Sequence, residues 1–81
     1  MMVDISVQVS LYPLRQEDLS QTINQALGIF HDNGLEVSPG IMSTLVKGDD
    51  EAVFAALRNA FLRAAEKEQV VMFTTFSNTP P

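Results

Sequence analysis

The chain has 81 residues, of which 46% are hydrophobic, and ten acidic against five basic residues give a formal net charge of −5. One small domain of this length buries only about 60–65% of its unfolded surface. The absence of cysteine excludes disulfides and thiolate metal sites, a single histidine is too few for an imidazole-based metal centre, and the acidic balance argues against binding nucleic-acid phosphates.

The first element is indicated by strict alternation of apolar and polar side chains over residues 3–11. A period of two predicts a strand with one buried face. The buried set would be Val3, Ile5, Val7, Val9 and Leu11, and the other face would carry Asp4, Ser6, Gln8 and Ser10. The segment that follows, "SLYPLRQEDLSQ", is expected to form the first loop.

A helix is predicted next, because apolar residues recur on a 3.6-residue period and form one stripe. Its members are Leu19, Ile23, Ala26, Leu27 and Phe30. The helix should end at "DNG", where Gly34 can adopt the left-handed cap conformation. His31 would then lie near the carboxyl end of the helix, where it is expected to face the negative end of the dipole.

A hairpin, a second helix and a last strand complete the chain. A short strand over 35–38 meets the "PG" turn signal and continues into "IMSTLVKG". Asp49, Asp50 and Glu51 suit the amino end of a helix. The buried stripe of that helix should comprise Val53, Leu57, Phe61 and Ala64, with Phe54, Ala60 and Ala65 alongside. The run "QVVMFTTFS" predicts the last strand.

The resulting order, β-α-β-β-α-β, predicts the ferredoxin-like α+β arrangement, a four-stranded antiparallel sheet with two helices on one face. We expect one domain over residues 1–81, with 77–81 as a disordered or extended tail. The second face of the sheet would have no helix to cover it, although the last strand offers apolar groups to both faces. We therefore expect a second copy to pack on it.

The first loop offers little catalytic or anion-binding chemistry. Arg15 is compatible with a phosphate site of the acylphosphatase kind, but "LYPL" has no glycine for close backbone approach, and Pro13 lacks an N–H donor. Helix-start chemistry explains the acidic residues at 49–51 without a magnesium site. We therefore expect a protein that is not an enzyme and needs no cofactor or metal.

Small-molecule binding remains, because uncharged hydroxyls beside aromatic and thioether side chains suit a flat, neutral heterocycle. The candidate ligand-binding residues are Ser10, Tyr12, Met42, Ser43, Thr44, Met72 and Phe76. The ordinary alternative is that the two methionines belong to the core and the serines and threonines are normal strand composition. An interaction module without a ligand stays open at this point.

The chain resembles the YkoF-like family that binds thiamin and hydroxymethylpyrimidine. The resemblance runs from about Ser10 to Asn78, and it is carried by "LYP" in the first loop, by "ST" before Gly48, and by the closing "TFS". It implies a non-catalytic protein of thiamin or hydroxymethylpyrimidine uptake or salvage, with a functional link to a thiamin-type transporter. Tyr12, Ser43 and Thr44 are the residues that it most directly implicates.

The resemblance has one departure, since YkoF itself looks like two fused units and this chain has one. A homodimer or tetramer formed through the sheet faces would replace the fused pair. Two rivals remain: an ACT-like regulatory or oligomerisation module that binds another metabolite, and a small acylphosphatase-like hydrolase. The segment "MMVDISVQV" has no basic start followed by a long apolar stretch, and no apolar run reaches about 18 residues, so we expect a cytoplasmic protein.

Overall fold

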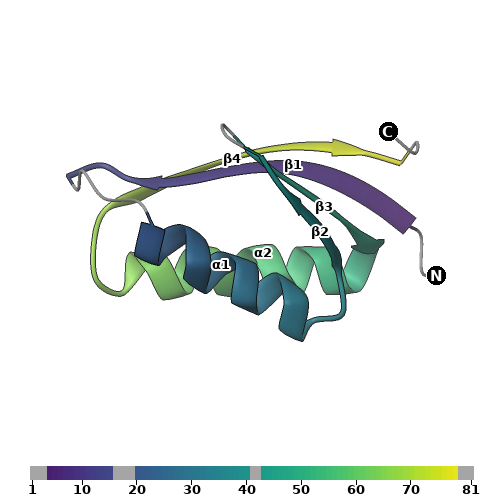
Figure 1. Cartoon of the computed structure of the whole chain (residues 1–81), viewed down its shortest axis with the longest axis horizontal. Coiled ribbons are helices and arrows are strands. Elements are labelled where there is room, and N and C mark those ends of the chain that lie inside the picture. Colours follow the sequence, from purple (N-terminus) through teal and green to yellow (C-terminus); the bar gives the residue numbers. More distant parts are fainter. Residues whose placement is uncertain (1–3, 16–19, 41–42, 79–81) are drawn as a thin grey trace.

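The computed structural model describes residues 4–15, 20–40 and 43–78. Its elements are β1 (Asp4–Pro13), α1 (Ser20–Asp32), β2 (Glu36–Pro39), β3 (Thr44–Asp49), α2 (Asp50–Ala65) and β4 (Val70–Ser77). The four strands form one antiparallel sheet in the order β2-β3-β1-β4. Figure 1 shows both helices on the same side of this sheet. The predicted ferredoxin-like fold is confirmed.

Strand β1 is longer than the alternation predicted. Tyr12 and Pro13, which lie beyond the predicted alternation, belong to β1 and pair with β4, where Tyr12 lies opposite Val71. Proline is tolerated because it is the last residue of the strand. The next residue, Leu14, donates its N–H to the Gln69 carbonyl at 2.9 Å, which keeps the two chain segments together beyond the strand.

The core lies between the sheet and the two helices. On β1, Val7, Val9 and Leu11 are buried, as the alternation predicted, and Val46 of β3 has no exposed surface. Phe30, at 1% exposure, is the largest fully buried side chain, and it inserts from α1. Because α1 and α2 cover only this side, the face that carries Gln8 and Tyr12 has no helix over it.

Helix α2 corrects part of the predicted stripe. Its buried residues are Val53, Ala56, Leu57, Ala60 and Ala64. Phe61, which was expected in the core, is 37% exposed, and Phe54 is 54% exposed. These two phenylalanines are seven residues apart and share one side of the helix, which borders the buried stripe. The alanines bring α2 close to the sheet and leave the larger rings at the surface.

The predicted helix ends are confirmed. Gly34 has φ +72°, the left-handed conformation that favours glycine after a helix. Leu35 donates its N–H to the Phe30 carbonyl at 3.2 Å, so the end of α1 is closed by backbone hydrogen bonds. Asp49 is the N-cap of α2, and its carboxylate accepts the Ala52 N–H at 3.0 Å. His31 lies exposed in the last turn of α1.

Some sequence-based predictions fall on residues that the structure does not describe or on the end of the last strand. Met42, Leu19 and Val3 lie outside the described residues, as does 79–81 of the predicted tail, whereas Ser77 is the last residue of β4. In the part of the chain that the structure describes, no helix combines the length and the apolar character needed to cross a membrane.

Candidate functional site

A narrow cleft of about 80 Å³ opens between α1 and the sheet, and we call it the Thr44 cleft. It is lined by apolar side chains of β1 and α1 and by the turn that joins β2 to β3. The lining residues are Val9, Ser10, Leu11, Ile23, Ala26, Leu27, Phe30, Pro39, Gly40, Ser43 and Thr44. Its walls are therefore mostly aliphatic, with hydroxyl groups gathered at one end.

Strand geometry decides which hydroxyl is directed into the Thr44 cleft. Thr44 lies opposite Val9 in the β1–β3 pairing, and directly opposite residues point to the same face of the sheet. Since Val9 is buried under the helices, the half-buried Thr44 side chain points to the same side. Ser10 follows Val9 in β1, so its side chain is directed to the uncovered face, and Ser10 borders the cleft without pointing into it.

The turn at the end of the Thr44 cleft is fixed by a close backbone approach. Gly40 donates its N–H to the Ser43 carbonyl at 2.9 Å. A Cβ atom at position 40 would lie 2.6 Å from that same oxygen, which no ordinary side chain permits. The glycine of the predicted "PG" turn is thus required by the geometry that brings Ser43 and Thr44 beside α1.

The other predicted site residues lie elsewhere. The Tyr12 ring is 6.3 Å from the Phe73 ring, centroid to centroid, on the uncovered face. Met72 lies opposite Leu11 and packs against the core, which agrees with the alternative prediction that this methionine is a core residue. Phe76 stacks on Phe54 of α2 with centroids 4.9 Å apart. The structure therefore brings Ser10, Ser43 and Thr44 together and separates Tyr12, Met72 and Phe76 from them.

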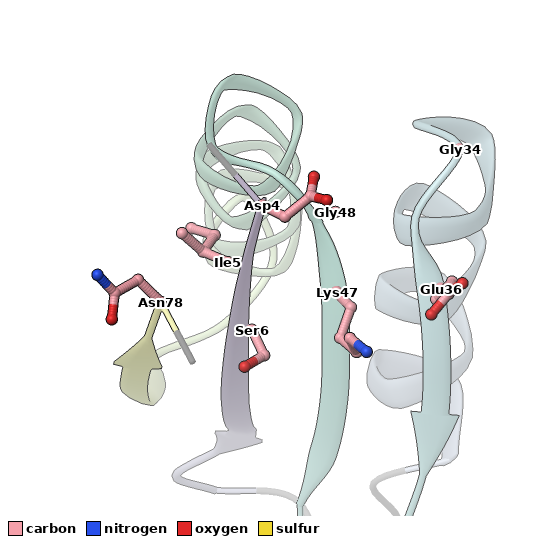
Figure 2. A pocket seen from close by; sticks show the side chains of 8 residues that line it. All are labelled: Asp4, Ile5, Ser6, Gly34, Glu36, Lys47, Gly48 and Asn78. Carbon is pink, nitrogen blue, oxygen red and sulfur yellow. The ribbon is translucent and has the colours of Figure 1, made fainter. Parts of the chain in front are cut away.

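A second and larger opening, of about 400 Å³, lies at the other end of β3, and we call it the Lys47 cavity. Figure 2 shows its lining side chains, which come from β1, β2 and β3 and from the segment after β4. They are Asp4, Ile5, Ser6, Gly34, Glu36, Lys47, Gly48 and Asn78. None of these residues was among the predicted site residues.

The Lys47 cavity combines charges of both signs. Lys47 lies between Ser6 of β1 and Glu36 of β2, each directly opposite it in the strand pairing. Gly48 lies beside it, and a Cβ atom at that position would displace the end of the Leu35 side chain. Only strand register brings these residues together, so no local sequence signal could have found them. Among the described residues, no three histidine or acidic side chains form a group that could hold a metal ion.

The two openings differ in size as well as in chemistry. Ligand sites in proteins commonly enclose about 300–1,000 Å³ and are mostly apolar with a few polar groups. The Lys47 cavity has such a volume, but its lining is charged. The Thr44 cleft has the mostly apolar lining and is too small as it stands. The Thr44 cleft would have to widen to hold a ring.

The family model that matches this sequence is that of the YkoF-related family, and the match covers residues 4–81. The chain belongs to the YkoF-related family. The match extends over β1 to β4 and so includes both the Thr44 cleft and the Lys47 cavity. No curated protein matches the chain.

Solved structures share the fold at low sequence identity. A hypothetical protein of Methanocaldococcus jannaschii has a TM-score of 0.87 at 23% identity, with 94% of this chain and 80% of that chain covered. A Thermotoga maritima protein, named provisionally for thiamine biosynthesis or salvage, has a TM-score of 0.79 at 14% identity, covering 91% and 82%. A Streptococcus pneumoniae protein has a TM-score of 0.82 at 17% identity, covering 93% and 86%. These likenesses concern the fold alone.

Proposed function

We propose that this member of the YkoF-related family binds the aminopyrimidine part of thiamin, or free hydroxymethylpyrimidine, without catalysing a reaction, and serves uptake or salvage. The family membership and the name of the Thermotoga maritima neighbour support the class of ligand. The observation that carries the proposal is the position of Thr44, a hydroxyl directed into a mostly apolar cleft.

The chemistry of the Thr44 cleft suits that ring. An aminopyrimidine has two flat apolar faces, which the side chains of Leu27 and Ala26 and the strand residue Val9 would cover. It also has an amine donor beside ring-nitrogen acceptors, and a threonine hydroxyl can pair with either kind of group. A site that pairs the amine rejects analogues without it, because the hydroxyl is then left buried and unpaired.

The cationic thiazolium of thiamin would remain outside the cleft, where the net charge of −5 favours it. Entry of the pyrimidine requires the wall formed by α1 to give way. Ile23 of this wall is 37% exposed and Leu27 is half-buried, so this side of α1 is less firmly held than Phe30, which is 1% exposed. Binding therefore involves an outward shift of the amino-terminal half of α1.

The proposal includes a homodimer or tetramer formed through the uncovered sheet face. Tyr12, Phe73, Val71 and Leu45 offer apolar groups on that face, and Phe73 is 62% exposed. Gln8 and Thr75, at its centre, are uncharged. A second sheet packed on this face would cover the stacked Tyr12 and Phe73 rings, which a single chain leaves in contact with water.

Calorimetric titration tests the ligand class. We expect heat of binding from hydroxymethylpyrimidine and from thiamin, and no heat from the pyrimidine analogue that carries hydrogen in place of the exocyclic amine. A panel of amino acids at the same concentrations serves as the control ligand set. Heat from an amino acid, with none from either pyrimidine compound, would contradict the proposal.

One observation favours a second candidate, the ACT-like module that binds a metabolite such as an amino acid. The lining of the Lys47 cavity includes one ammonium group and the carboxylates of Glu36 and Asp4, charges of both signs that a zwitterion could complement. Lys47→Met keeps the apolar stem and removes the charge. Under this candidate the variant loses amino-acid binding, whereas under the first proposal it binds hydroxymethylpyrimidine as the wild type does.

A further inference from the structure

A half-buried glutamate connects the amino end of α1 to the segment between α2 and β4. Thr22 of α1 is buried, and its hydroxyl donates a hydrogen bond to Oε1 of Glu68 at 3.0 Å. The two residues are 46 positions apart in the sequence. Figure 1 shows the amino end of α1 and the segment that follows α2 at the same end of the molecule. This hydrogen bond therefore holds the start of α1 against the second half of the chain.

The second oxygen of the Glu68 carboxylate is an exception among buried polar atoms. Oε2 is buried, and it has no hydrogen-bond partner in the part of the chain that the structure describes. Buried polar atoms are nearly always paired, and leaving one unpaired costs free energy, more so for a charged group. The bond from Thr22 stabilises the contact, and the desolvated Oε2 destabilises it by a comparable amount. The contact therefore holds α1 only weakly.

The glutamate side of this contact is fixed by backbone hydrogen bonds. The Glu66 N–H donates to the Leu62 carbonyl at 3.2 Å, which ties the segment to the end of α2. The Leu14 N–H, directly after β1, donates to the Gln69 carbonyl at 2.9 Å. Glu68 lies between these two attachments. When the contact breaks, the amino end of α1 is therefore the part that moves.

The contact is coupled to the Thr44 cleft through α1. Thr22 begins the buried stripe of this helix, which continues with Ala26 and Phe30 at intervals of four residues. Ala26 and Phe30 line the cleft, and so does Ile23, the neighbour of Thr22. Backbone hydrogen bonds join residues one turn apart, so a displacement of Thr22 also displaces Ile23 and Ala26. The contact at Glu68 thus controls one wall of the cleft without touching a ligand in it.

We propose that the bond from Thr22 to Glu68 is a latch that sets how often the Thr44 cleft widens, with Glu68 as a positioning residue. The inference rests on the proposed function, because a ring needs the cleft to widen. In the closed form, Oε2 is buried without a partner. In the open form, water reaches both oxygens. The ligand binds the open form, so the measured affinity rises with the fraction of open molecules.

Hydrogen exchange of backbone amides, followed by mass spectrometry in the absence of ligand, tests the latch. Thr22→Val keeps the shape of the side chain and removes the donor. We expect the amides of residues 24–27 to exchange about tenfold faster than in the wild type, because local opening sets the exchange rate. The amides of α2 should keep their rates. Thr22→Ser, the matched control, keeps a hydroxyl and should exchange as the wild type does. Unchanged exchange at 24–27 in Thr22→Val would overturn the proposal.

A double variant reverses the expected sign, and it keeps the test decisive if Thr22→Val does not fold. Replacing both partners by apolar groups of similar shape removes the unpaired oxygen together with its bonded neighbour. The protein with Thr22→Val and Glu68→Leu should therefore hold α1 more firmly. We expect residues 24–27 to exchange about tenfold more slowly than in the wild type. Exchange at the wild-type rate or faster in this folded double variant would contradict the latch.

Calorimetry with hydroxymethylpyrimidine then separates the latch from the proposed function. The same opening equilibrium governs exchange and binding, so Thr22→Val should lower the Kd about tenfold and the double variant should raise it about tenfold. Tighter binding by a less stable protein is not expected of a residue that only supports the fold. Equal Kd values in all three proteins would overturn the coupling to the cleft. If none of them binds the compound, the proposed function fails, and the exchange rates alone decide the latch.

Discussion

The Thr44 cleft and the Lys47 cavity occupy opposite ends of strand β3, and they are held by different interactions. The cleft end is formed by packing, with Phe30 and Val9 fully or nearly fully buried against it. At the cavity end the structure shows backbone features, namely the N-cap Asp49, the left-handed Gly34 and the strand register that sets Lys47 opposite Glu36. One strand can thus border a small, mostly apolar cleft at one end and a larger, charged cavity at the other.

The largest expected effect comes from truncating a buried side chain at the cleft end of β3. Phe30→Ala should lower the free energy of unfolding by about 3–5 kcal/mol, because a fully buried ring leaves a cavity in the core. The measurement is urea unfolding followed by circular dichroism. Phe61→Ala is the matched control, the same change at a ring that is 37% exposed on α2, and it should cost much less. Equal losses would mean that the cleft end is not held by packing.

The next effect concerns the ligand and separates the two openings. Thr44→Val removes the hydroxyl and keeps the shape, so hydroxymethylpyrimidine should bind about 1–3 kcal/mol more weakly. That corresponds to a rise in Kd of roughly 5- to 150-fold in calorimetry. Thr75→Val, the same substitution at an exposed position of β4, is the control and should bind as the wild type does. An unchanged Kd for Thr44→Val would remove the cleft from the site.

A smaller effect is expected at the cavity end. Asp49→Ala removes the carboxylate that accepts the Ala52 N–H, and it should lower the free energy of unfolding by about 1 kcal/mol. Thermal unfolding measures it. Asp49→Asn, which keeps an acceptor at the same place, should recover most of the loss. A loss as large as that of Phe30→Ala would show that the cap stabilises the cavity end as strongly as packing stabilises the cleft end.

The smallest effect is expected from Tyr12. Its ring stacks near Phe73 on the uncovered face, on the opposite side of the sheet from Thr44. Tyr12→Ala should therefore change the Kd for hydroxymethylpyrimidine less than twofold, whereas the loss of an aromatic wall would cost about 1–1.5 kcal/mol. Calorimetric titration of Tyr12→Ala, with Tyr12→Phe as the control, measures this change in Kd. A marked loss in the alanine variant alone would place the ligand at the contact between sheets.

Local physics made most of the fold predictable from the sequence. Alternation placed Val7, Val9 and Leu11 in the core, the "DNG" segment placed the left-handed Gly34, and Asp49 capped α2 as helix-start chemistry requires. Phe61 was predicted wrongly because a helix with many alanines can turn several faces to a sheet. Close approach of the backbone favoured the alanine face, and that choice depends on the partner surface.

The candidate site was predictable only in part. The sequence determined which residue types were present and which neighbours alternate within one strand, since both are properties of the local chain. The tertiary structure decided that Thr44 faces the helices, that Tyr12 faces away from them, and that Lys47 meets Glu36 and Ser6. These positions depend on the register between strands far apart in the sequence. Register is set by the packing of the whole buried face, which no single segment contains.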